Sequence, residues 1–285
     1  MPAPFTRIAI AGTGLIGASF ALAVRQVLPG ARLAGWDKPD VLARALAGGV
    51  VDEGHARLGD ALADADLIYI ALPLGLTIER LPEVARHAAP GALVSDAAST
   101  KRAVCKAAGN CFTGGARFLG GHPMAGKEDS GLDAAEAALF RGAKYALIGA
   151  RDDDPRVSCF VDLLEAIGAR PIWMDAAKHD RAAAVVSHLP QLLAVALAGV
   201  IREQTDQSGL PLTLAGRGLR DALRLAGSPY ALWRDIVLTN TDNLESALDR
   251  LAQAIEHLRA NLRQRELEEE FAAANEIYKI LRDLQ

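Results

Sequence analysis

Short apolar runs alternate with helix-like segments along the first 175 residues of the chain. The apolar runs have the length and composition of buried strands, and they cover residues 7–12, 32–37, 66–73, 92–97, 117–121, 144–149 and 170–175. Alanine- and leucine-rich segments between them repeat their apolar positions about every 3.6 residues, as at 15–28, 40–47 and 157–168. This alternation predicts an α/β fold with a doubly wound, mostly parallel sheet.

The pattern changes after Asp175. A long apolar helical segment follows at 176–204, and the sequence shows no convincing strand after it. Pro190 lies inside this segment and is expected to kink the helix or to break its hydrogen-bond ladder. We therefore expect two domains, an α/β domain over residues 1–175 and an all-α helical domain over residues 176–285.

A stripe of apolar residues at steps of four and three begins after Thr241. It consists of Leu244, Leu248, Leu251, Ile255, Leu258 and Leu262, an a/d pattern over nearly three heptads. The stripe fits a helix that packs within its own domain, and it also fits a helical interface between two copies of the chain. The apolar content of residues 182–201 favours the second interpretation, a homodimer formed through the helical domain.

Composition and charge exclude several classes of protein. The 285 residues are 51% hydrophobic and 23% charged, which is typical of a soluble globular protein, and a formal net charge of −4 provides no basic surface for nucleic acid. The three cysteines have no metal-ligand spacing, so no metal site is expected. No run of eighteen residues is apolar throughout, and the first residues show no signal peptide. We expect a cytoplasmic protein with no membrane partner.

A glycine motif follows the first apolar run at the start of a helix. Gly12, Gly14 and Gly17 have the G-x-G-x-x-G spacing, with Leu15 and Ile16 between them. The first glycine allows a tight turn, the second lets the backbone approach a pyrophosphate, and the third allows the helix to pack closely on the strand. The N-terminus of the helix then faces negative charge. The motif in this context predicts a Rossmann-type dinucleotide-binding domain.

An acidic residue, Asp37, ends the second apolar run, twenty residues after the last glycine of the motif. A carboxylate there accepts hydrogen bonds from the adenosine ribose and repels a 2′-phosphate, so NAD is expected as the cofactor over NADP. Lys38 follows and weakens the exclusion of NADP. Ligands of such sheets bind beyond the carboxyl ends of the strands, where Pro73 and the segments 95–101 and 120–126 lie. Pro73 is thus a candidate cofactor contact, although a proline also simply ends a strand.

Two residues near these strand ends are candidates for chemistry. His122 lies between two glycines and a proline in "FLGGHPMAGKEDSG". A titratable ring on so constrained a loop indicates a functional group, and a turn with a solvated histidine is the alternative. Ser99 fits a position beside the nicotinamide, and it fits equally well as a cap of the helix that begins near residue 100.

Two further histidines lie in the long helical segment. His179 and His188 are nine residues apart, which is about 900° at 100° per residue, so they are expected on opposite sides of the helix. At most one of them then faces a given site. His188 lies among apolar residues beside Pro190, and it is either a residue of the site or a hydrogen-bonded histidine of the core.

Charged residues gather at 216–236, in an otherwise apolar region. Arg220 and Arg224 are four residues apart, and Asp221 and Arg224 are three apart, so these side chains are neighbours on a helix. An arginine held by Asp221 is positioned to bind a carboxylate through two hydrogen bonds. A structural network of ion pairs is the alternative.

Five segments in order resemble a known family. They are "GTGLIGASFA", "SDAASTK", "GGHPMAGKEDSGLDAA", "HDRAAAVVSHLPQLLAVAL" and "LRDALRLAGSPYALWRDI". Together they resemble the prephenate and arogenate (cyclohexadienyl) dehydrogenases of tyrosine biosynthesis along nearly the whole chain. The resemblance implies an NAD-dependent oxidoreductase that converts prephenate to 4-hydroxyphenylpyruvate, arogenate to tyrosine, or both.

The resemblance also implies roles for individual residues. His122 matches the histidine that accepts a hydrogen bond from the ring hydroxyl of the substrate, and Ser99 matches the serine that orients this histidine and the nicotinamide. His188 matches a histidine that contacts substrate. Arg224 matches the arginine that binds a substrate carboxylate, although Leu223 replaces the family's threonine beside it.

Acidic residues and two departures complete the comparison with the family's pattern. Glu128 and Asp221 match acidic residues that form an ion network with the arginine. Gln191 stands where a second histidine is frequent after S-H-L-P, and Asp129 stands where a basic or amide residue is frequent. Either departure can alter the preference between a keto-acid and an amino-acid side chain.

The reaction that the resemblance implies has a simple division of labour. A neutral His122 takes the proton of the ring hydroxyl while hydride passes to the nicotinamide, and decarboxylation makes the ring aromatic.

A β-hydroxyacid or imine dehydrogenase is the alternative enzyme, but hydroxyacid members need a lysine on the interdomain helix, and after Lys178 the only lysine is Lys279. A non-catalytic NAD-binding module is the other alternative, and it needs neither a histidine loop nor an arginine cluster.

Overall fold

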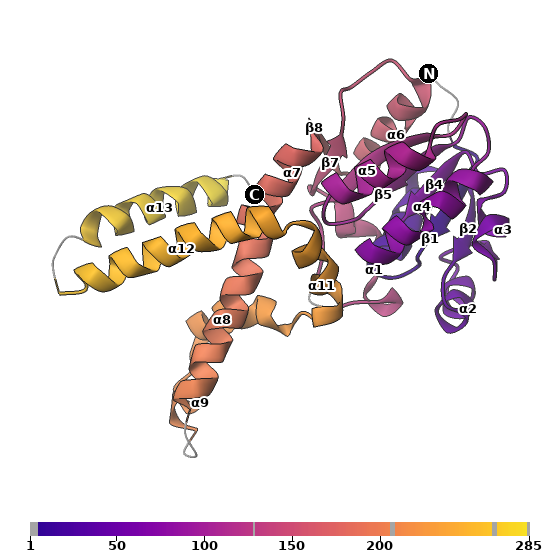
Figure 1. The fold of residues 1–285 in the computed structure, drawn as a ribbon. Helices are drawn as coiled ribbons and strands as arrows, with labels where there is room; N and C mark the ends of the chain where they lie inside the picture. Colours follow the sequence, from indigo (N-terminus) through magenta and orange to yellow (C-terminus); the bar gives the residue numbers. More distant parts are fainter. Residues whose placement is uncertain (1–4, 128, 206–208, 264–266, 284–285) are drawn as a thin grey trace. The chain divides into compact units, whose positions relative to one another are not determined.

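The structure is a computed structural model that describes residues 5–127, 129–205, 209–263 and 267–283. Contacts within the chain divide it into two compact units, Met1–Asn240 and Thr241–Gln285. The larger unit holds a sheet covered by helices and continues into a long helical segment (Figure 1). The smaller unit is helical throughout its described residues.

The sheet has eight strands in the order β3-β2-β1-β4-β5-β6-β7-β8. The strands are β1 (Arg7–Ala11), β2 (Arg32–Trp36), β3 (Glu53–Gly54), β4 (Leu67–Ile70), β5 (Leu93–Asp96), β6 (Arg117–Pro123), β7 (Lys144–Ile148) and β8 (Arg170–Met174). Neighbouring strands are parallel, except that β6 and β7 are antiparallel. The first six strands therefore have the Rossmann order, and the predicted α/β fold with a mostly parallel sheet is confirmed.

Alternate residues of the central strands enter two separate cores, one on each face of the sheet. In β1, Ile8 and Ile10 belong to one hydrophobic cluster, and Ala9 and Ala11 belong to the other. The first cluster includes residues of α1 (Leu15–Val27), α2 (Pro39–Ala47) and α6 (Pro155–Ala166), and the second includes residues of α3 (Leu58–Leu62), α4 (Leu74–His87) and α5 (Arg102–Cys111). Burial on both faces explains why the strands appear in the sequence as continuous apolar runs.

Parallel pairing brings several loops to one edge of the sheet. β4 pairs with β1 and β5, and β6 pairs in parallel with β5, so the carboxyl ends of all four strands share that edge. The glycine motif follows β1, Pro73 follows β4, Ser99 follows β5, and His122 lies in the last part of β6. Two 3-10 turns, η1 (Leu132–Ala134) and η2 (Ala137–Phe140), then return the chain and pack against α1.

The long helical segment has an irregular turn in its middle. It consists of α7 (Ala176–Ala183), a π-helical turn η3 (Ala184–His188) and α8 (Leu189–Gln204), and Pro190 lies in the first turn of α8. Proline cannot donate a backbone hydrogen bond, and a π turn directly before it accommodates that loss. The prediction that Pro190 interrupts the hydrogen-bond ladder is confirmed.

Shorter helices connect α8 back to the sheet domain. They are α9 (Leu210–Thr213), α10 (Arg217–Leu223), a 3-10 turn η4 (Arg224–Gly227) and α11 (Tyr230–Thr239). α10 and η4 pack against α8, and α11 packs against α4. The carboxylate of Asp235 on α11 accepts a hydrogen bond from the backbone N–H of Gly75 at the start of α4, at 3.1 Å. This contact favours the α4 N-terminus because a negative charge there faces the positive end of the helix dipole.

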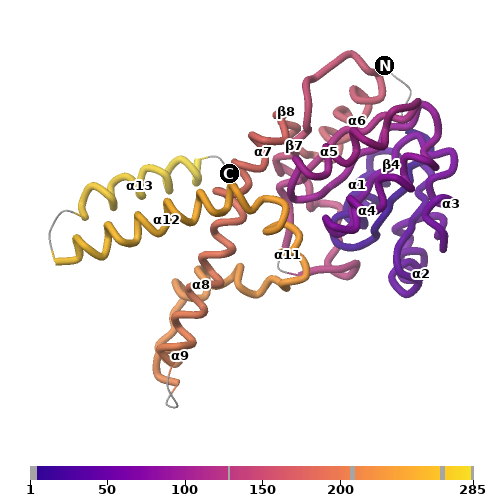
Figure 2. Tube along the Cα trace, viewed as in Figure 1, coloured from indigo at the N-terminus to yellow at the C-terminus, as the bar shows by residue number. Residues whose placement is uncertain are grey.

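The smaller unit is built from α12 (Thr241–Asn261) and α13 (Glu268–Asp283), which can be followed in the trace of Figure 2. His257 and Glu270 join the two helices through a contact of 2.6 Å. The predicted leucine stripe lies on α12, where Leu244 is buried but Ile255 is 49% exposed. The described residues after β8 contain no strand, as expected.

Much of the apolar surface of α7, η3 and α8 is not buried within the chain. By length and composition alone, the segment Ala176–Gln204 is apolar enough to cross a membrane, and only 22% of its most apolar window is buried. Val186, Val195 and Val200 are each more than half exposed. Length and composition are a weak criterion, because a helix that is buried in a subunit interface meets it as well.

Candidate active site

The glycine motif forms a tight loop between β1 and α1. Gly12 has a φ of +96°, and a Cβ atom there would lie 2.5 Å from the carbonyl oxygen of Ala71. A Cβ on Gly17 would lie 1.8 Å from the carbonyl oxygen of Gly12. Among the described residues, no atom lies within 4 Å of a Cβ built on Gly14. Gly12 and Gly17 are therefore required by the fold, whereas Gly14 leaves open space at the N-terminus of α1 for a ligand.

Asp37 lies directly after β2 and binds this loop. Its Oδ2 accepts hydrogen bonds from the backbone N–H of Thr13 at 2.6 Å and from the Thr13 hydroxyl at 3.1 Å. Pro73 is the N-cap residue of α4, two positions after the carbonyl that meets Gly12. Leu15 and Ile16 are half-buried in the first turn of α1. These residues gather where the strand order reverses between β1 and β4, which is where Rossmann sheets bind dinucleotides.

His122 is held in the sheet by close packing around its preceding glycine. A Cβ on Gly121 would lie 2.6 Å from the carbonyl oxygen of Asp96 in β5. Strand β6 therefore packs closely against β5 at this point, and His122 is only 9% exposed. A turn with a solvated histidine is therefore wrong, because the residue belongs to β6 and is buried.

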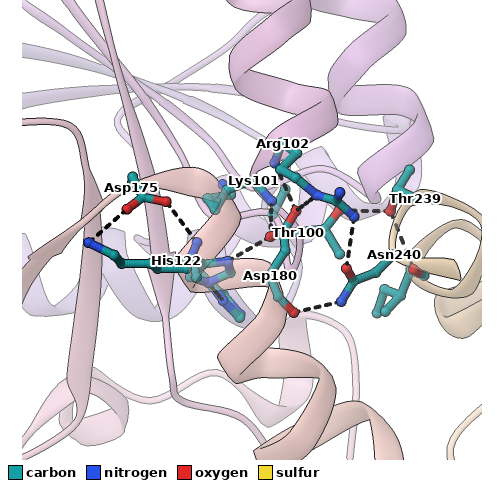
Figure 3. A network of polar contacts seen from close by, with 12 residues as sticks. Thr100, Lys101, Arg102, His122, Asp175, Asp180, Thr239 and Asn240 are labelled. Carbon is teal, nitrogen blue, oxygen red and sulfur yellow. Dashed lines mark hydrogen bonds and ion pairs between the residues drawn. The ribbon is translucent and has the colours of Figure 1, made fainter. Parts of the chain in front are cut away.

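The ring of His122 begins a chain of buried polar contacts. Its Nδ1 lies 2.9 Å from Nε2 of His179, and Nδ1 of His179 lies 2.8 Å from Oδ1 of Asp180. Asp180 is fully buried and also accepts hydrogen bonds from the backbone N–H groups of Lys101 at 2.7 Å and Arg102 at 2.9 Å. Figure 3 shows Asp180 between His122 and the start of α5. The carboxylate thus connects α7, β6 and α5.

Asp180 also decides between the two interpretations of Ser99. The N-cap residue of α5 is Lys101, and its side chain makes no hydrogen bond that caps the helix. The carboxylate of Asp180 accepts the hydrogen bonds of the first backbone N–H groups instead, so a cap by Ser99 is wrong. Ser99 is half-buried, and within the described parts of the chain its hydroxyl has no hydrogen-bond partner. The hydroxyl is available to a ligand.

Lys101 places a buried positive charge behind His122. Its ammonium is fully buried, forms an ion pair with Asp96 and donates to the carbonyl oxygen of Gly121 at 2.5 Å. Burial is the largest cause of a pKa of His122 well below 6.5, and electrostatic interactions with His179, Lys101 and His188 lower it further. The His122 imidazole is therefore neutral at neutral pH.

His188 is buried and belongs to the same network. It is 1% exposed, and its Nδ1 lies 3.2 Å from Nδ2 of Asn240, whose amide also donates to the backbone carbonyl of Asp180 at 2.8 Å. Burial lowers the pKa of His188 to about 4. The prediction that at most one of His179 and His188 faces a given site is wrong, because polar contacts through Asp180 and Asn240 join both rings to one buried network. A π-helical turn lies between the two histidines and changes the rotation per residue. The value of 100° per residue on which the prediction rested therefore does not hold over this segment.

The charged segment lies on the helices that follow α8. Arg224 is exposed at the start of η4, which packs against α8, and Asp221 is exposed on α10. Glu128 lies outside the described residues. The predicted network of these three residues, and the role of Arg224 as a carboxylate ligand, stay predictions.

Gln191 is 3% exposed, one turn after His188 on α8. Its Oε1 is buried without a hydrogen-bond partner in the parts of the chain that the structure describes. A buried amide oxygen without a partner is costly in a folded chain, so a ligand that donates to it gains binding energy there.

Sequence periodicity missed His179, Asp180 and Asn240. The sequence did contain a signal for the first two residues, because a histidine lies beside an acidic residue at the start of an apolar helix. Such residues are buried mainly when they pair with other polar groups, so a buried polar contact could have been predicted there. Their distant partners lie 57 to 79 residues away for His179 and Asp180, and 52, 60 and 138 residues away for Asn240. Periodicity within one element carries no information about such contacts.

Comparison with known proteins agrees with this geometry. The family described as prephenate dehydrogenase, nucleotide-binding domain, matches residues 20–173, and prephenate dehydrogenase, dimerization domain, matches residues 175–276. The prephenate dehydrogenase of Bacillus subtilis is 34% identical over 93% of this chain and 72% of its own length.

Solved structures agree as well. Prephenate dehydrogenase from A. aeolicus in complex with hydroxyphenyl propionate and NAD+ is similar with a TM-score of 0.86 and 26% identity over all of both chains. The arogenate dehydrogenase of Synechocystis has a TM-score of 0.80 and 31% identity, over 97% of this chain and all of that one.

A Rossmann sheet with an open glycine loop and a buried neutral histidine at the same edge defines a nucleotide-dependent dehydrogenase. Within this class, the chain belongs to the prephenate dehydrogenase family. The resemblance that the five sequence segments indicated is confirmed, and the hydroxyacid dehydrogenase and the non-catalytic module are not favoured.

Proposed function

We propose that this chain catalyses the oxidative decarboxylation of prephenate, of arogenate or of both, with hydride transfer to NAD. The observation that carries the proposal is the buried, neutral His122 at the carboxyl edge of the sheet that also presents the open glycine loop. Its Nε2 has no hydrogen-bond partner among the described residues, so this atom is available to a substrate hydroxyl. The named activities of the similar proteins support the same reaction.

The chemistry balances with one histidine. Nε2 of His122 accepts the proton of the ring hydroxyl as the hydrogen on the same carbon leaves as hydride. Bound NAD supplies the hydride acceptor. The bond from the ring to its carboxylate breaks to release CO₂, and its electron pair completes the aromatic ring. His122 then returns its proton to the phenol oxygen, so no net proton is released.

Other residues orient and neutralise the substrate in this proposal. Arg224 binds a carboxylate of the substrate, and Asp221 and Glu128 hold its guanidinium in place. His188, at the end of η3, also contacts the substrate. Ser99 orients the nicotinamide and the ring of His122. The free hydroxyl of Ser99 and the contact of His188 with Asn240, which joins it to Asp180, support these roles.

NAD is the proposed cofactor in preference to NADP. Asp37 places a carboxylate at the end of β2, where it repels a 2′-phosphate, and Oδ2 is fixed by Thr13. The glycine loop fits a pyrophosphate at Gly14, where a side chain would fill the open space. The A. aeolicus relative was solved with NAD+.

We further propose a cytoplasmic homodimer with a domain boundary at residue 175. The two family models meet between residues 173 and 175, which supports a dinucleotide-binding domain over 1–175 and a helical substrate and dimerisation domain over 176–285. The exposed apolar residues of α8 support an interface between two copies. No nucleic acid or membrane partner is proposed, because the net charge is −4 and a subunit interface accounts for the apolar helix.

Turnover by the purified full chain tests the proposed function. Prephenate and arogenate are each supplied with NAD or NADP, and formation of reduced cofactor and of the aromatic product is measured. We expect turnover with NAD, and His122→Asn is expected to keep KM but to lose kcat by about 10²-fold or more. Arg224→Ala is expected mainly to raise KM, on the order of tenfold or more. Absence of turnover with both substrates would exclude the proposed function, and an unchanged KM in Arg224→Ala would return the arginine to a structural role.

A further inference from the structure

We propose that His179 and Asp180 are positioning residues that fix the tautomer of His122, so that its Nε2 carries the lone pair that accepts the substrate proton. The inference rests on the proposed function for the identity of that proton. The observation behind it is a continuous buried chain of contacts from Asp180 through His179 to His122.

The direction of each hydrogen bond follows from the carboxylate. Asp180 only accepts, so Nδ1 of His179 carries the hydrogen in the contact of 2.8 Å. In this proposal His179 is a neutral imidazole with its single N–H group at Nδ1, so its Nε2 is an acceptor. The contact of 2.9 Å then requires Nδ1 of His122 to donate. Nε2 of His122 is left without a hydrogen, facing no partner in the described residues.

The argument needs Asp180 to stay ionised although it is fully buried. Burial alone would raise its pKa, but hydrogen bonds from His179 and from the backbone N–H groups of Arg102 and Lys101 lower the pKa overall. Those two N–H groups are the positive end of α5, and Nε of Arg102 adds a contact at 3.3 Å. The helix terminus therefore stabilises the charge that orients the two rings.

The surroundings of His122 favour its neutral form. The groups that face His122 are His179 from α7, His188 from η3 and Lys101 from the start of α5, and all three disfavour a positive charge on it. The ammonium of Lys101 is held in place by Asp96 and by the carbonyl of Gly121, which precedes His122. When His122 takes the substrate proton, the positive charge that forms is joined to Asp180 through two hydrogen bonds.

Asn240 gives His188 the opposite tautomer by the same reasoning. Its Nδ2 donates to the carbonyl oxygen of Asp180 at 2.8 Å, and Oδ1 accepts from Arg102 at 3.4 Å, which fixes the orientation of the amide. The second hydrogen of Nδ2 therefore points to Nδ1 of His188, 3.2 Å away. His188 is left with a hydrogen on Nε2. The network thus presents one accepting imidazole and one donating imidazole.

Variants of His179 separate this role from simple packing. A glutamine at 179 keeps an oxygen that accepts from Nδ1 of His122, whereas a leucine of similar size does not. We expect His179→Leu to lose kcat by about 10²-fold or more, with KM for both substrates within about threefold, and His179→Gln to retain most of kcat. A carboxylate that orients an imidazole is worth about 10⁴-fold in the serine protease triad, which sets the scale for Asp180→Asn.

Asp175→Asn is the matched control. Asp175 caps α7 by accepting from the backbone N–H of Lys178 at 2.8 Å, and it is exposed and outside the chain of contacts. The substitution removes a negative charge from the same helix without touching the two rings, and asparagine keeps an oxygen that caps α7, so we expect kcat to be unchanged. Nitrogen NMR of histidine-labelled protein reads the tautomer directly, with His122→Asn used to assign the signals. We expect hydrogen on Nδ1 of His122 in the wild type and in His179→Gln, and a mixture of tautomers in His179→Leu.

The outcomes distinguish this inference from the proposed function. If the wild type turns over prephenate or arogenate while His179→Leu keeps wild-type kcat and tautomer, the positioning role is excluded and the function stands. If the wild type has neither activity, the proposed function fails, and the NMR experiment still decides the tautomer. Should Asp180→Asn fail to fold because α5 loses its cap, the comparison of His179→Gln with His179→Leu carries the test alone.

Discussion

At the scale of single residues, burial sets the charge of the histidines before any ligand binds. His122 and His188 are 9% and 1% exposed, and desolvation is the largest cause of the lowered pKa of each. The ordinary pKa of histidine is 6.5, whereas the pKa of His188 is about 4 in the folded chain. Between these values the unfolded chain binds protons that the folded chain does not. Each lowered pKa therefore makes folding less favourable as the pH falls below 6.5.

Below pH 6.5 we expect the free energy of unfolding to decrease as the pH decreases, by about 1.4 kcal/mol per pH unit for each of the two histidines. Paired carboxylates act at lower pH: the pKa of Glu53 is about 2, so its contribution is complete above its ordinary value of 4.5. Urea unfolding at about pH 7.5, 6.5 and 5.5 measures the slope. His188→Gln should remove about half of the slope. Equal stability at all three values would show that the buried imidazoles take up protons.

At the scale of elements, two glycines serve different purposes in strand and loop. Gly121 in β6 has no room for a side chain, because Asp96, Ser95 and Tyr145 all lie within 3.0 Å of the Cβ position. Gly14 before α1 has a φ of −75° that any residue adopts, and its Cβ position is open. Packing between strands explains the glycine at position 121. The second has no explanation within the described chain except the approach of a ligand.

Alanine at each position separates the two purposes. We expect Gly121→Ala to lower the free energy of unfolding by about 1–3 kcal/mol, since backbone and core atoms must move to admit the methyl group. Gly14→Ala should unfold at the wild-type temperature but bind NAD more weakly. Thermal unfolding and calorimetric titration with NAD measure both properties on both variants. If Gly14→Ala destabilises the chain and leaves NAD affinity unchanged, the open space at that loop is not a cofactor site.

Periodicity predicted most of the elements because burial leaves a direct trace in the sequence. All seven apolar runs became strands, and the central strands are covered on both faces, whereas β8 is only partly buried and β3 has two residues, Glu53 and Gly54, and no apolar run. The long helix was expected, but the directions of its histidines were not, because a π turn changes the rotation within it. Local pattern thus gives the type of an element more reliably than the direction of its side chains.

At the scale of the whole molecule, the candidate site is assembled from contacts that no single segment encodes. Asp180 caps α5 from a helix 79 residues further along the chain, where the local sequence offered Ser99. The motif "GGHP" singled out His122 as a candidate, but its partners come from α7 and from the start of α5. The family resemblance supplied the predicted roles of the residues, and the fold supplied the buried network of polar contacts around them.

The exposed apolar surface of α8 belongs to this largest scale, because a single copy of the chain leaves it uncovered. Val195 and Val200 are 51% and 56% exposed on α8, which lies within the part matched by the dimerization domain. Burial of such a surface in a second copy removes apolar area from water and favours association.

We therefore expect sedimentation equilibrium to give twice the chain mass of 30.1 kDa. Val195→Arg should shift the protein toward 30.1 kDa, because the interface would bury an unpaired charge. Ala43→Arg adds the same charge at an exposed position of α2, in the dinucleotide-binding part, and should remain a dimer. A wild type that sediments as a monomer at micromolar concentration, with Val195→Arg unchanged, would leave the apolar face to another partner. It would also remove the basis for assigning α8 to a subunit interface.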